Sequence, residues 1–171
     1  WPKTRIQRCL FHVWQNIRSK LTLNPQTLAG RQLLALFREI WDVKTFDQAE
    51  AWQAQFGWLK KRHGSFIKQR TYHQDPQPGQ RKWWYTHRGV RSAYRQIDKL
   101  LADNQLFTYL DRSLTTELIP RTTSYLEGGI NSQLKEKLKL HRGLSQLHQQ
   151  RLVDWYLYSR TQEPKPPRNV L

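Results

Sequence analysis

The sequence has very little of what would cross-link the chain or carry it into a membrane. It contains a single cysteine, Cys9, so no disulfide can form within the chain, and we expect a reducing compartment, the cytoplasm. No apolar run approaches the length of a membrane span or a secretory signal, so we expect no membrane partner. Methionine is absent and the chain starts at Trp1, which favours a fragment or an isolated domain with functional residues upstream.

Acidic residues are also scarce. Thirteen Asp and Glu face 29 Lys and Arg, which gives a formal net charge of +16 and a pI near 10.4. An excess of this size favours a polyanionic partner, most simply a nucleic acid. The alternative at this point is a basic protein whose charge serves only its solubility. With 37% hydrophobic residues, the 171 residues suffice for one domain, or for a domain that carries an insertion.

The positive charge is concentrated between residues 60 and 95, where Asp75 is the one acid among ten Lys and Arg. Residues 73–79 are rich in turn formers and lead into Arg81, Lys82 and three consecutive aromatic residues, 83–85. Cations beside adjacent rings suit a nucleic-acid surface, because cations meet phosphates and rings stack on exposed bases. The alternative is that the two tryptophans, Trp83 and Trp84, pin the loop to the core.

Apolar residues recur at helical spacing along most of the chain, which predicts a mostly α structure. Asn24 and Pro25 are expected to start one helix, and Thr45 with Gln48 forms a capping box for the next. The predicted buried stripes are Leu10, Val13, Trp14, Ile17 and Leu21; Leu33, Leu34, Phe37, Ile40 and Trp41; Ala49, Trp52, Phe56 and Leu59; Val90, Tyr94, Ile97 and Leu101; and Leu147, Leu152, Trp155 and Tyr156.

Two further segments depart from the helical pattern, and one helix carries a basic stripe. Residues 3–9 are predicted to form one strand with Ile6 buried. Residues 161–171 are rich in proline and are predicted to form a loose tail. Trp58 is predicted to pack, as aromatic residues of this kind usually do. Within the helix that starts near residue 88, basic residues follow one another about one turn apart: Arg88, Arg91 and Arg95.

Residues 121–135 combine a helix start with a row of polar side chains. Ser124 is expected to cap the helix, with Glu127 closing a capping box. Asn131 and Lys135 follow Glu127 at four and eight residues and share its face. On spacing alone, Glu127 only faces the positive end of the helix dipole. The paired glycines at 128–129 disfavour that reading: each lowers helix stability by roughly 1 kcal/mol relative to Ala, and they permit close approach of a ligand or a nucleic-acid strand.

The opposite side of this helix is apolar, and its end is basic. Ile130, Leu134 and Leu138 are expected to anchor it to a core. Basic residues then follow, which would place positive charge near the Glu127 carboxylate: Lys135, Lys137, Lys139 and Arg142. Ser145 is expected to cap the last helix.

Cys9 and His12 lie three residues apart, a spacing that raises the question of a metal site. A structural zinc ion takes four ligands, and the sequence offers no second cysteine and no cluster of histidines at ligand spacing. The residues therefore favour a buried, apolar Cys9 and a packed or hydrogen-bonded His12. A zinc-bound regulator built on these two residues remains the weaker alternative.

Three segments together resemble a known family. Residues 121–131, from Arg121 through Glu127 to Asn131, resemble the C-terminal acidic motif of Mutator-type DDE transposases of bacterial insertion sequences. Residues 7–16, with Cys9 and His12, resemble the Cys-x-x-His segment of that family, and residues 83–88 resemble part of its intervening helical region. The three segments occur in the order of the family and span nearly the whole chain.

The resemblance implies a ribonuclease H-like fold and DNA transposition by a mobile element, in which DNA is bound, cut and recombined by strand transfer. It implies that Glu127 is the last of three metal-binding carboxylates, with Cys9, His12 and Asn131 near the active site. Such chemistry uses two Mg²⁺ ions, and one carboxylate cannot hold both, so the complete enzyme would need two further Asp upstream. The chain alone is therefore expected to bind DNA without cutting it.

The expected architecture is mostly α, with a partial ribonuclease H-like α/β core interrupted by an all-α insertion. Residues 1–24 would give the core one short strand and a helix, residues 25–115 would form the insertion, and residues 116–160 would return to the core with the acidic motif. DNA is the expected partner, and a second copy of the chain is a further one. The candidate DNA contacts are Arg81, Lys82, Trp83, Trp84, Arg88, Arg91, Arg121, Lys135, Lys139 and Arg142. The rival interpretation is a non-catalytic basic helical module that binds DNA or RNA.

Overall fold

The computed structural model describes residues 4–114 and 118–164. These residues fall into two compact units that divide between Thr122 and Thr123. Most described residues are helical, and the sheet that they contain has two antiparallel strands. The expected mostly α class is therefore confirmed. Of the predicted tail, residues 161–164 hold no helix or strand, and the remainder lies outside the described residues.

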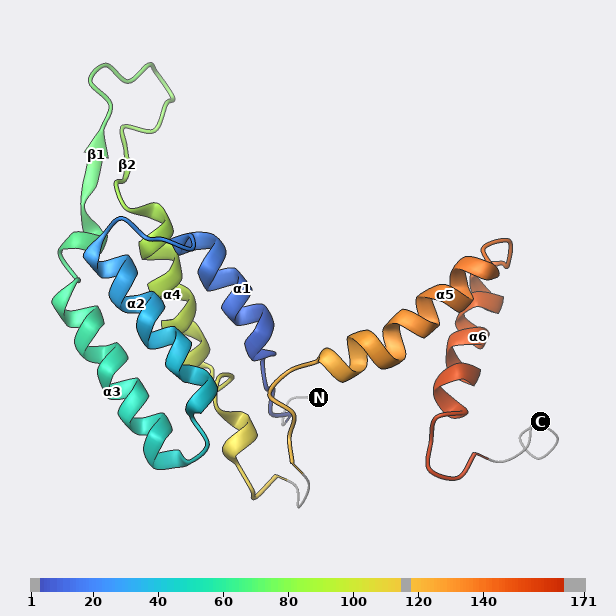
Figure 1. Cartoon of the computed structure of the whole chain (residues 1–171). Coiled ribbons are helices and arrows are strands. Elements are labelled where there is room, and N and C mark those ends of the chain that lie inside the picture. Colours follow the sequence, from blue (N-terminus) through green and yellow to red (C-terminus); the bar gives the residue numbers. More distant parts are fainter. Residues whose placement is uncertain (1–3, 115–117, 165–171) are drawn as a thin grey trace. The chain divides into compact units, whose positions relative to one another are not determined.

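Four α-helices build the first unit (Figure 1). Helix α1 packs against α2 and α4, and α2 also packs against α3. Short 3₁₀ turns η1, η2 and η3 connect or extend the helices. The bounds are α1 (Leu10–Leu21), α2 (Leu28–Arg38), η1 (Glu39–Asp42), α3 (Phe46–Arg62), η2 (Phe66–Lys68), α4 (Arg88–Ala102) and η3 (Thr108–Leu110).

Aromatic rings fill the centre of this bundle. The Trp52 ring is buried and meets the rings of Phe37, Phe56 and Phe107 at centroid distances of 6.0, 6.0 and 5.6 Å. Its Nε1–H donates a hydrogen bond of 2.9 Å to the Leu36 carbonyl oxygen, so its polar atom is satisfied inside the core. All four predicted core positions of α3 are buried, whereas Trp58, which was predicted to pack, is 53% exposed.

A β-hairpin stands out from one end of the bundle (Figure 1). Strands β1 (Arg70–Tyr72) and β2 (Trp83–Tyr85) pair with Arg70 opposite Tyr85, Thr71 opposite Trp84 and Tyr72 opposite Trp83. Because side chains alternate along a strand, one face carries the pairs at the strand ends and the other carries Thr71 and Trp84. The hydroxyls of Thr71 and Thr86 hydrogen-bond across the base of the hairpin at 2.8 Å. The rings of 83–85 thus lie on a paired strand.

The predicted strand at residues 3–9 is wrong for the residues described there. Residues 4–9 have no strand partner, and Ile6 is 49% exposed instead of buried. The loop after α4 holds this segment by separate hydrogen bonds instead. Arg8 N–H donates to the Gln105 carbonyl at 2.9 Å, and the Tyr109 N–H donates to Gln7 Oε1 at 2.9 Å.

Two of the predicted helix caps are confirmed, and a third lies further along the chain than predicted. Thr45 forms its capping box with Gln48, and the Ser145 hydroxyl accepts a hydrogen bond from the His148 N–H. The helix predicted to begin at Asn24 begins instead at Leu28, where the Thr27 hydroxyl accepts from a backbone N–H. The residues after Asn24 form no helical turn, so the proline signal marks the loop before the helix and not its first turn.

The second unit is a pair of helices preceded by a π-helical turn. The turn η4 (Leu126–Asn131) runs directly into α5 (Ser132–Leu140), which packs on α6 (Gln146–Tyr158). Tyr156 is buried, and its hydroxyl donates to Gln133 Oε1 at 2.9 Å. The predicted anchors of the Glu127 helix are half-buried, and two of the four residues in the stripe predicted on the last helix are exposed: Leu147 and Trp155.

A close approach of two helices explains the glycine in the first turn of α4, Gly89. A Cβ placed on Gly89 would lie 2.4 Å from the Lys20 carbonyl oxygen at the end of α1. Substituting alanine there forces the two backbones apart, and overpacking of this kind costs about 1–3 kcal/mol. We therefore expect Gly89→Ala to lower the urea midpoint of the first unit.

Gly57 provides the matched control for this substitution. It lies inside α3, and a Cβ added to it would meet nothing within 4 Å. Gly57→Ala should raise the urea midpoint, because alanine is the better helix former by about 1 kcal/mol. Equal midpoints for the two variants would show that the α1–α4 contact tolerates a methyl group.

Among the described residues, every helix is too short or too polar to serve as a membrane span.

Candidate nucleic-acid interface

An open groove of about 610 Å³ in the first unit is surrounded by basic side chains. The residues that line it come from the end of α1, from the second half of the hairpin and from α4. Six of the nine are Lys or Arg and none is acidic, so the groove concentrates positive potential. The lining residues are Lys20, Arg81, Tyr85, Arg88, Arg91, Ser92, Arg95, Gln96 and Lys99.

Helix α4 supplies most of this charge because its sequence separates an apolar face from a basic one. Ala93, Tyr94, Ile97 and Leu100 are buried. The basic side chains recur about one turn apart on the other side of the helix, as expected for a period of 3.6 residues. The acid of this helix, Asp98, lies outside the groove lining and pairs with Lys60 at 2.5 Å.

Helix α1 adds one cation to the groove, Lys20, and no pattern in the sequence of α1 indicates this role. Lys20 reaches the groove because the end of α1 lies against Gly89. Its ammonium group donates a hydrogen bond to the side-chain oxygen of Gln96, which fixes it beside the α4 stripe. Lys20 was not among the predicted contacts, because only the packing of α1 on α4 brings it there.

Guanidinium groups lie over the rings of the hairpin. The Cζ atoms of Arg70 and Arg81 lie 4.0 and 5.0 Å from the centroid of the Trp83 ring. The Cζ atom of Arg91 lies 3.7 Å from the Tyr85 ring, and the two rings meet edge to face at 5.1 Å. All these distances fall within the range of cation–π attraction, which reaches about 6 Å. One face of the hairpin is therefore a contiguous set of rings and cations.

The two tryptophans of the hairpin have different surroundings. Trp84 points to the opposite face from Trp83, and its ring meets the His73 ring edge-on at 4.7 Å. Both tryptophans are half-buried, and neither belongs to the hydrophobic core of the bundle. The loop is thus not pinned to that core by these rings. Lys82 is exposed, and its carbonyl oxygen accepts from the His73 N–H at 3.0 Å.

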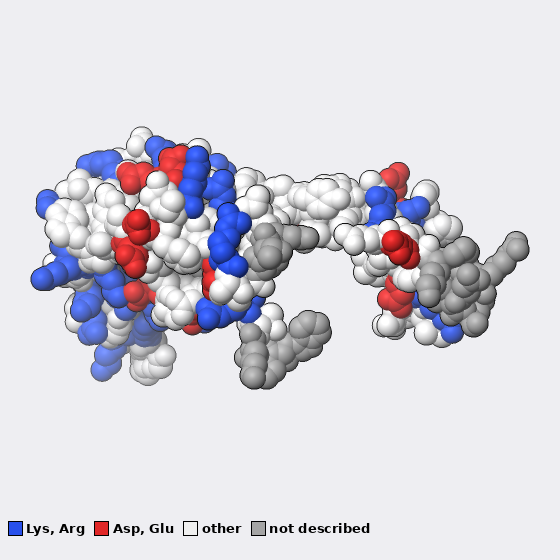
Figure 2. Space-filling model, turned by 90° about the horizontal axis from the view of Figure 1, so that it is seen from below, with Lys and Arg blue, Asp and Glu red and all other residues white. Residues whose placement is uncertain are grey.

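The end of the bundle away from the hairpin has a different character. Figure 2 faces that end, and there acidic side chains lie among the basic ones. Acids of the first unit also occur in η1 and the first turns of α3: Glu39, Asp42, Asp47 and Glu50. None of them lines the basic groove.

Glu127 lies in the π-helical turn of the second unit and is exposed. The Thr123 hydroxyl donates to its Oε1 at 2.6 Å, and the Glu127 N–H donates to the Thr123 carbonyl at 2.9 Å. Ser124, the predicted cap, is already the first helical residue. The predicted capping box between Ser124 and Glu127 is therefore wrong, and the Glu127 carboxylate accepts from the Thr123 hydroxyl instead.

The other predicted residues of this helix share the second unit with Glu127. Asn131 closes the π-helical turn, and the side chains of Lys135, Lys139 and Arg142 are exposed. Within residues 4–114 and 118–164, no three His, Cys, Asp or Glu side chains lie close enough together to hold a metal ion. Glu127 with its described neighbours therefore does not form a Mg²⁺ site by itself.

Cys9 and His12 belong to the first unit. Cys9 immediately precedes α1 and is half-buried, which is less burial than its sequence context indicated. His12 is exposed, and its ring lies edge-on to that of Phe11 at 5.9 Å. Neither residue belongs to a described group with metal-binding geometry.

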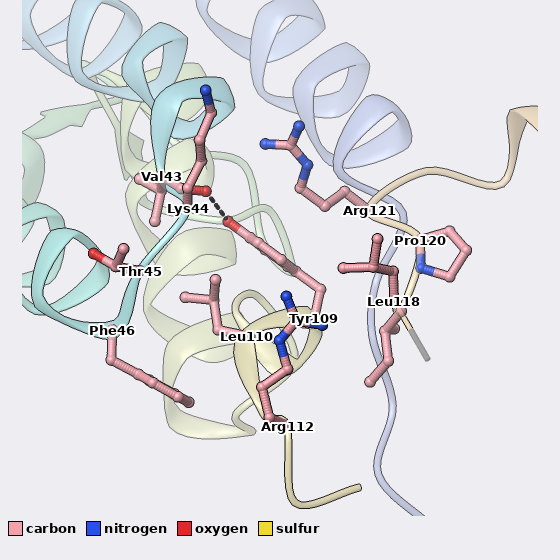
Figure 3. A pocket seen from close by; sticks show the side chains of 11 residues that line it. Val43, Lys44, Thr45, Phe46, Tyr109, Leu110, Arg112, Leu118, Pro120 and Arg121 are labelled. Carbon is pink, nitrogen blue, oxygen red and sulfur yellow. Dashed lines mark hydrogen bonds between the residues drawn. The ribbon is translucent and has the colours of Figure 1, made fainter. Parts of the chain in front are cut away.

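Arg121 holds the first unit together at a second hollow of about 540 Å³ (Figure 3). Its guanidinium donates to the Trp41 carbonyl at 2.8 Å, and its own carbonyl accepts from the Leu10 N–H at 2.9 Å. The Tyr109 hydroxyl in the same hollow donates to the Val43 carbonyl at 2.8 Å. Burial raises the pKa of Tyr109, and the charge of Arg121 opposes that rise. The guanidinium thus has a structural role, whatever further contacts it makes.

Searches of family models, of curated proteins and of solved structures gave no match to this chain.

Proposed function

We propose that this chain binds DNA through the groove between α1, α4 and the hairpin. The observation that carries the proposal is the set of six cations around one groove without an acid among the lining residues. Such an array binds the phosphate backbone of nucleic acids and releases the counterions that neutralise it. A net charge of +16 supports the same partner by steering it toward the surface over long distances.

We propose further that the chain is the C-terminal part of a DDE transposase catalytic domain. Support comes from the three ordered segments that resemble that family, one of which includes the rings of β2. In this proposal Glu127 and Asn131 belong to a ribonuclease H-like core whose remaining carboxylates lie outside the described residues. Helix α1 was expected in that core, but it packs on α2 and α4 in the first unit.

Binding of a labelled DNA duplex, followed by fluorescence anisotropy over a range of salt concentrations, tests the first proposal. The logarithm of the association constant should fall linearly with the logarithm of the salt concentration, with a slope of about −0.9 for each phosphate contact. An association that is absent, or insensitive to salt, would contradict a phosphate-binding groove.

Glu127→Gln separates binding from catalysis. The chain with this substitution should bind the duplex within about twofold of the unchanged chain, because Glu127 is not among the residues that line the groove and belongs to the other unit. In the natural protein that carries this sequence, the same substitution should abolish DNA strand transfer, measured by joining of a labelled transposon end to plasmid DNA. Full strand transfer by the Gln variant would contradict the catalytic role of Glu127, and it would not affect the proposal that the groove binds DNA.

A non-catalytic DNA- or RNA-binding module is the second candidate. It is favoured by one observation, namely that the groove lies wholly within the first unit and needs no residue from the unit that holds Glu127. Absence of strand transfer by the unchanged natural protein, together with salt-dependent binding, would favour this candidate.

A further inference from the structure

We infer that the groove takes duplex DNA, and that Trp83 and Tyr85 serve as supports for guanidinium groups instead of as platforms for unstacked bases. This inference rests on the proposed DNA-binding function and adds to it the form of the nucleic acid. It also assigns the two rings a role that composition alone leaves open, because rings beside cations occur in both single-strand and duplex binders.

Guanidinium groups already lie over the ring faces of the hairpin. A single-stranded binder presents open aromatic faces on which successive bases stack. On this hairpin two guanidinium groups, from Arg70 and Arg81, lie within 5.0 Å of the Trp83 centroid. The Tyr85 ring has Arg91 at 3.7 Å and the edge of Trp83 beside it. A base would have to displace these cations before it could stack.

A guanidinium group stacked on a ring can still bind phosphate. A guanidinium that lies on a ring keeps its N–H groups directed outward, where they can donate two parallel hydrogen bonds to phosphate oxygens. Its side chain has already lost rotamer freedom, so little more is lost when a phosphate binds. The rings thereby hold two long, exposed side chains of the hairpin as an array of donors: Arg70 and Arg81. Arg91 is held over Tyr85 in the same way, with one guanidinium nitrogen donating to the Ile67 carbonyl at 3.4 Å.

The basic residues of α4 that line the groove form a long array. Arg88 and Lys99 are eleven residues apart on α4, which corresponds to about 16 Å along a helix. That distance equals the rise of roughly five base pairs of a duplex. A line of cations this long matches a rigid backbone with regular phosphates, and the hairpin continues the basic surface at one end of it.

The test compares a duplex with a single strand of the same sequence, both bound by the full chain at one salt concentration. We expect the duplex to bind about tenfold more tightly, because its higher charge density releases more counterions for each cation. Equal or tighter binding of the single strand would overturn the inference while leaving DNA binding intact. Absence of binding to either form would overturn the proposed function together with it.

Trp83→Leu tests the role of the ring. Duplex affinity should fall about three- to tenfold, since two cation–π contacts no longer hold their guanidinium groups. The loss should be much smaller when Arg70 and Arg81 are already replaced by glutamine, because the ring then has nothing to hold. An undiminished loss in that background, or a larger loss for the single strand, would show that the ring stacks on a base.

Two further variants separate the proposed role of the ring from a loss of folding or of a tryptophan in general. Arg70→Lys with Arg81→Lys keeps both charges and the Trp83 ring but loses the planar fork, and it should weaken duplex binding about as much as Trp83→Leu. Unchanged affinity in this variant would contradict the inference even if Trp83→Leu failed to fold. Trp58→Leu is the matched control: its ring also lies under a guanidinium, that of Arg62 at 5.0 Å, but both residues belong to α3 and not to the hairpin, and duplex affinity should not change.

Discussion

Replacing Trp52 by alanine is expected to lower the free energy of unfolding of the first unit by about 3–5 kcal/mol. The ring is buried, it contacts the rings of Phe37, Phe56 and Phe107, and its N–H group bonds the Leu36 carbonyl. Alanine removes these contacts and leaves that carbonyl without its side-chain donor. Domains are stable by only about 5–15 kcal/mol, so the variant should be close to unfolded at moderate urea concentrations.

Urea denaturation followed by far-ultraviolet circular dichroism measures this change. Trp58→Ala is the control, because Trp58 is the exposed tryptophan of the same helix. Substitutions at such surface positions usually change the free energy of unfolding by no more than about 0.5 kcal/mol. If the two variants lost the same stability, the centre of the bundle would not lie at Trp52.

Removing three charges from the α4 stripe should cause the largest loss of DNA binding. In the variant Arg88→Gln, Arg95→Gln, Lys99→Gln, we expect the duplex association constant to fall on the order of 100-fold at low salt. The slope of its logarithm against the logarithm of salt should become shallower by about 3, one for each phosphate contact removed. None of these three side chains is buried, so the fold should persist.

A second triple variant controls for net charge. Arg38→Gln, Lys44→Gln and Arg112→Gln remove the same formal charge from exposed positions outside the groove. Arg112 and Lys44 line the other hollow of the first unit, shown in Figure 3. The duplex association constant of this variant should fall by no more than about threefold, since salt screens charges that lie more than about 10 Å from the bound DNA. Equal losses in the two triple variants would mean that binding follows net charge and not the groove.

The helices of the first unit could be predicted because their apolar residues recur at a single period. Ala49, Trp52, Phe56 and Leu59 are all buried as expected. The prediction of a strand at residues 3–9 was wrong because it depended on one apolar residue, Ile6, and a single residue cannot define an alternating pattern. The hairpin was not predicted, since its strands are three residues each and three consecutive rings show no alternation of polar and apolar residues.

Part of the basic groove could also be predicted from the sequence, because several of its residues recur at the helical period. Arg88, Arg91 and Arg95 follow the period of one helix, and Lys99 continues it, so a longer reading of that stripe would have included it. Lys20 depends on packing between helices that are distant in the sequence, and no local pattern reports such a contact. The guanidinium–ring contacts of Trp83 likewise depend on strand register, which three-residue strands do not reveal.

The π-helical turn at residues 126–131 has a consequence for where the Glu127 carboxylate points. Such a turn closes its hydrogen bonds one residue later than an α-helix does, so it contains a one-residue surplus. Loss of that surplus, for example by deleting Gly128, would swing everything before it by about 100° around the axis of α5, the angle that one residue spans in an α-helix. The direction of the Glu127 side chain relative to Lys135 and Lys139 therefore depends on one extra residue within the helix. In a homologue that lacks one of the two glycines, the carboxylate would point in a different direction.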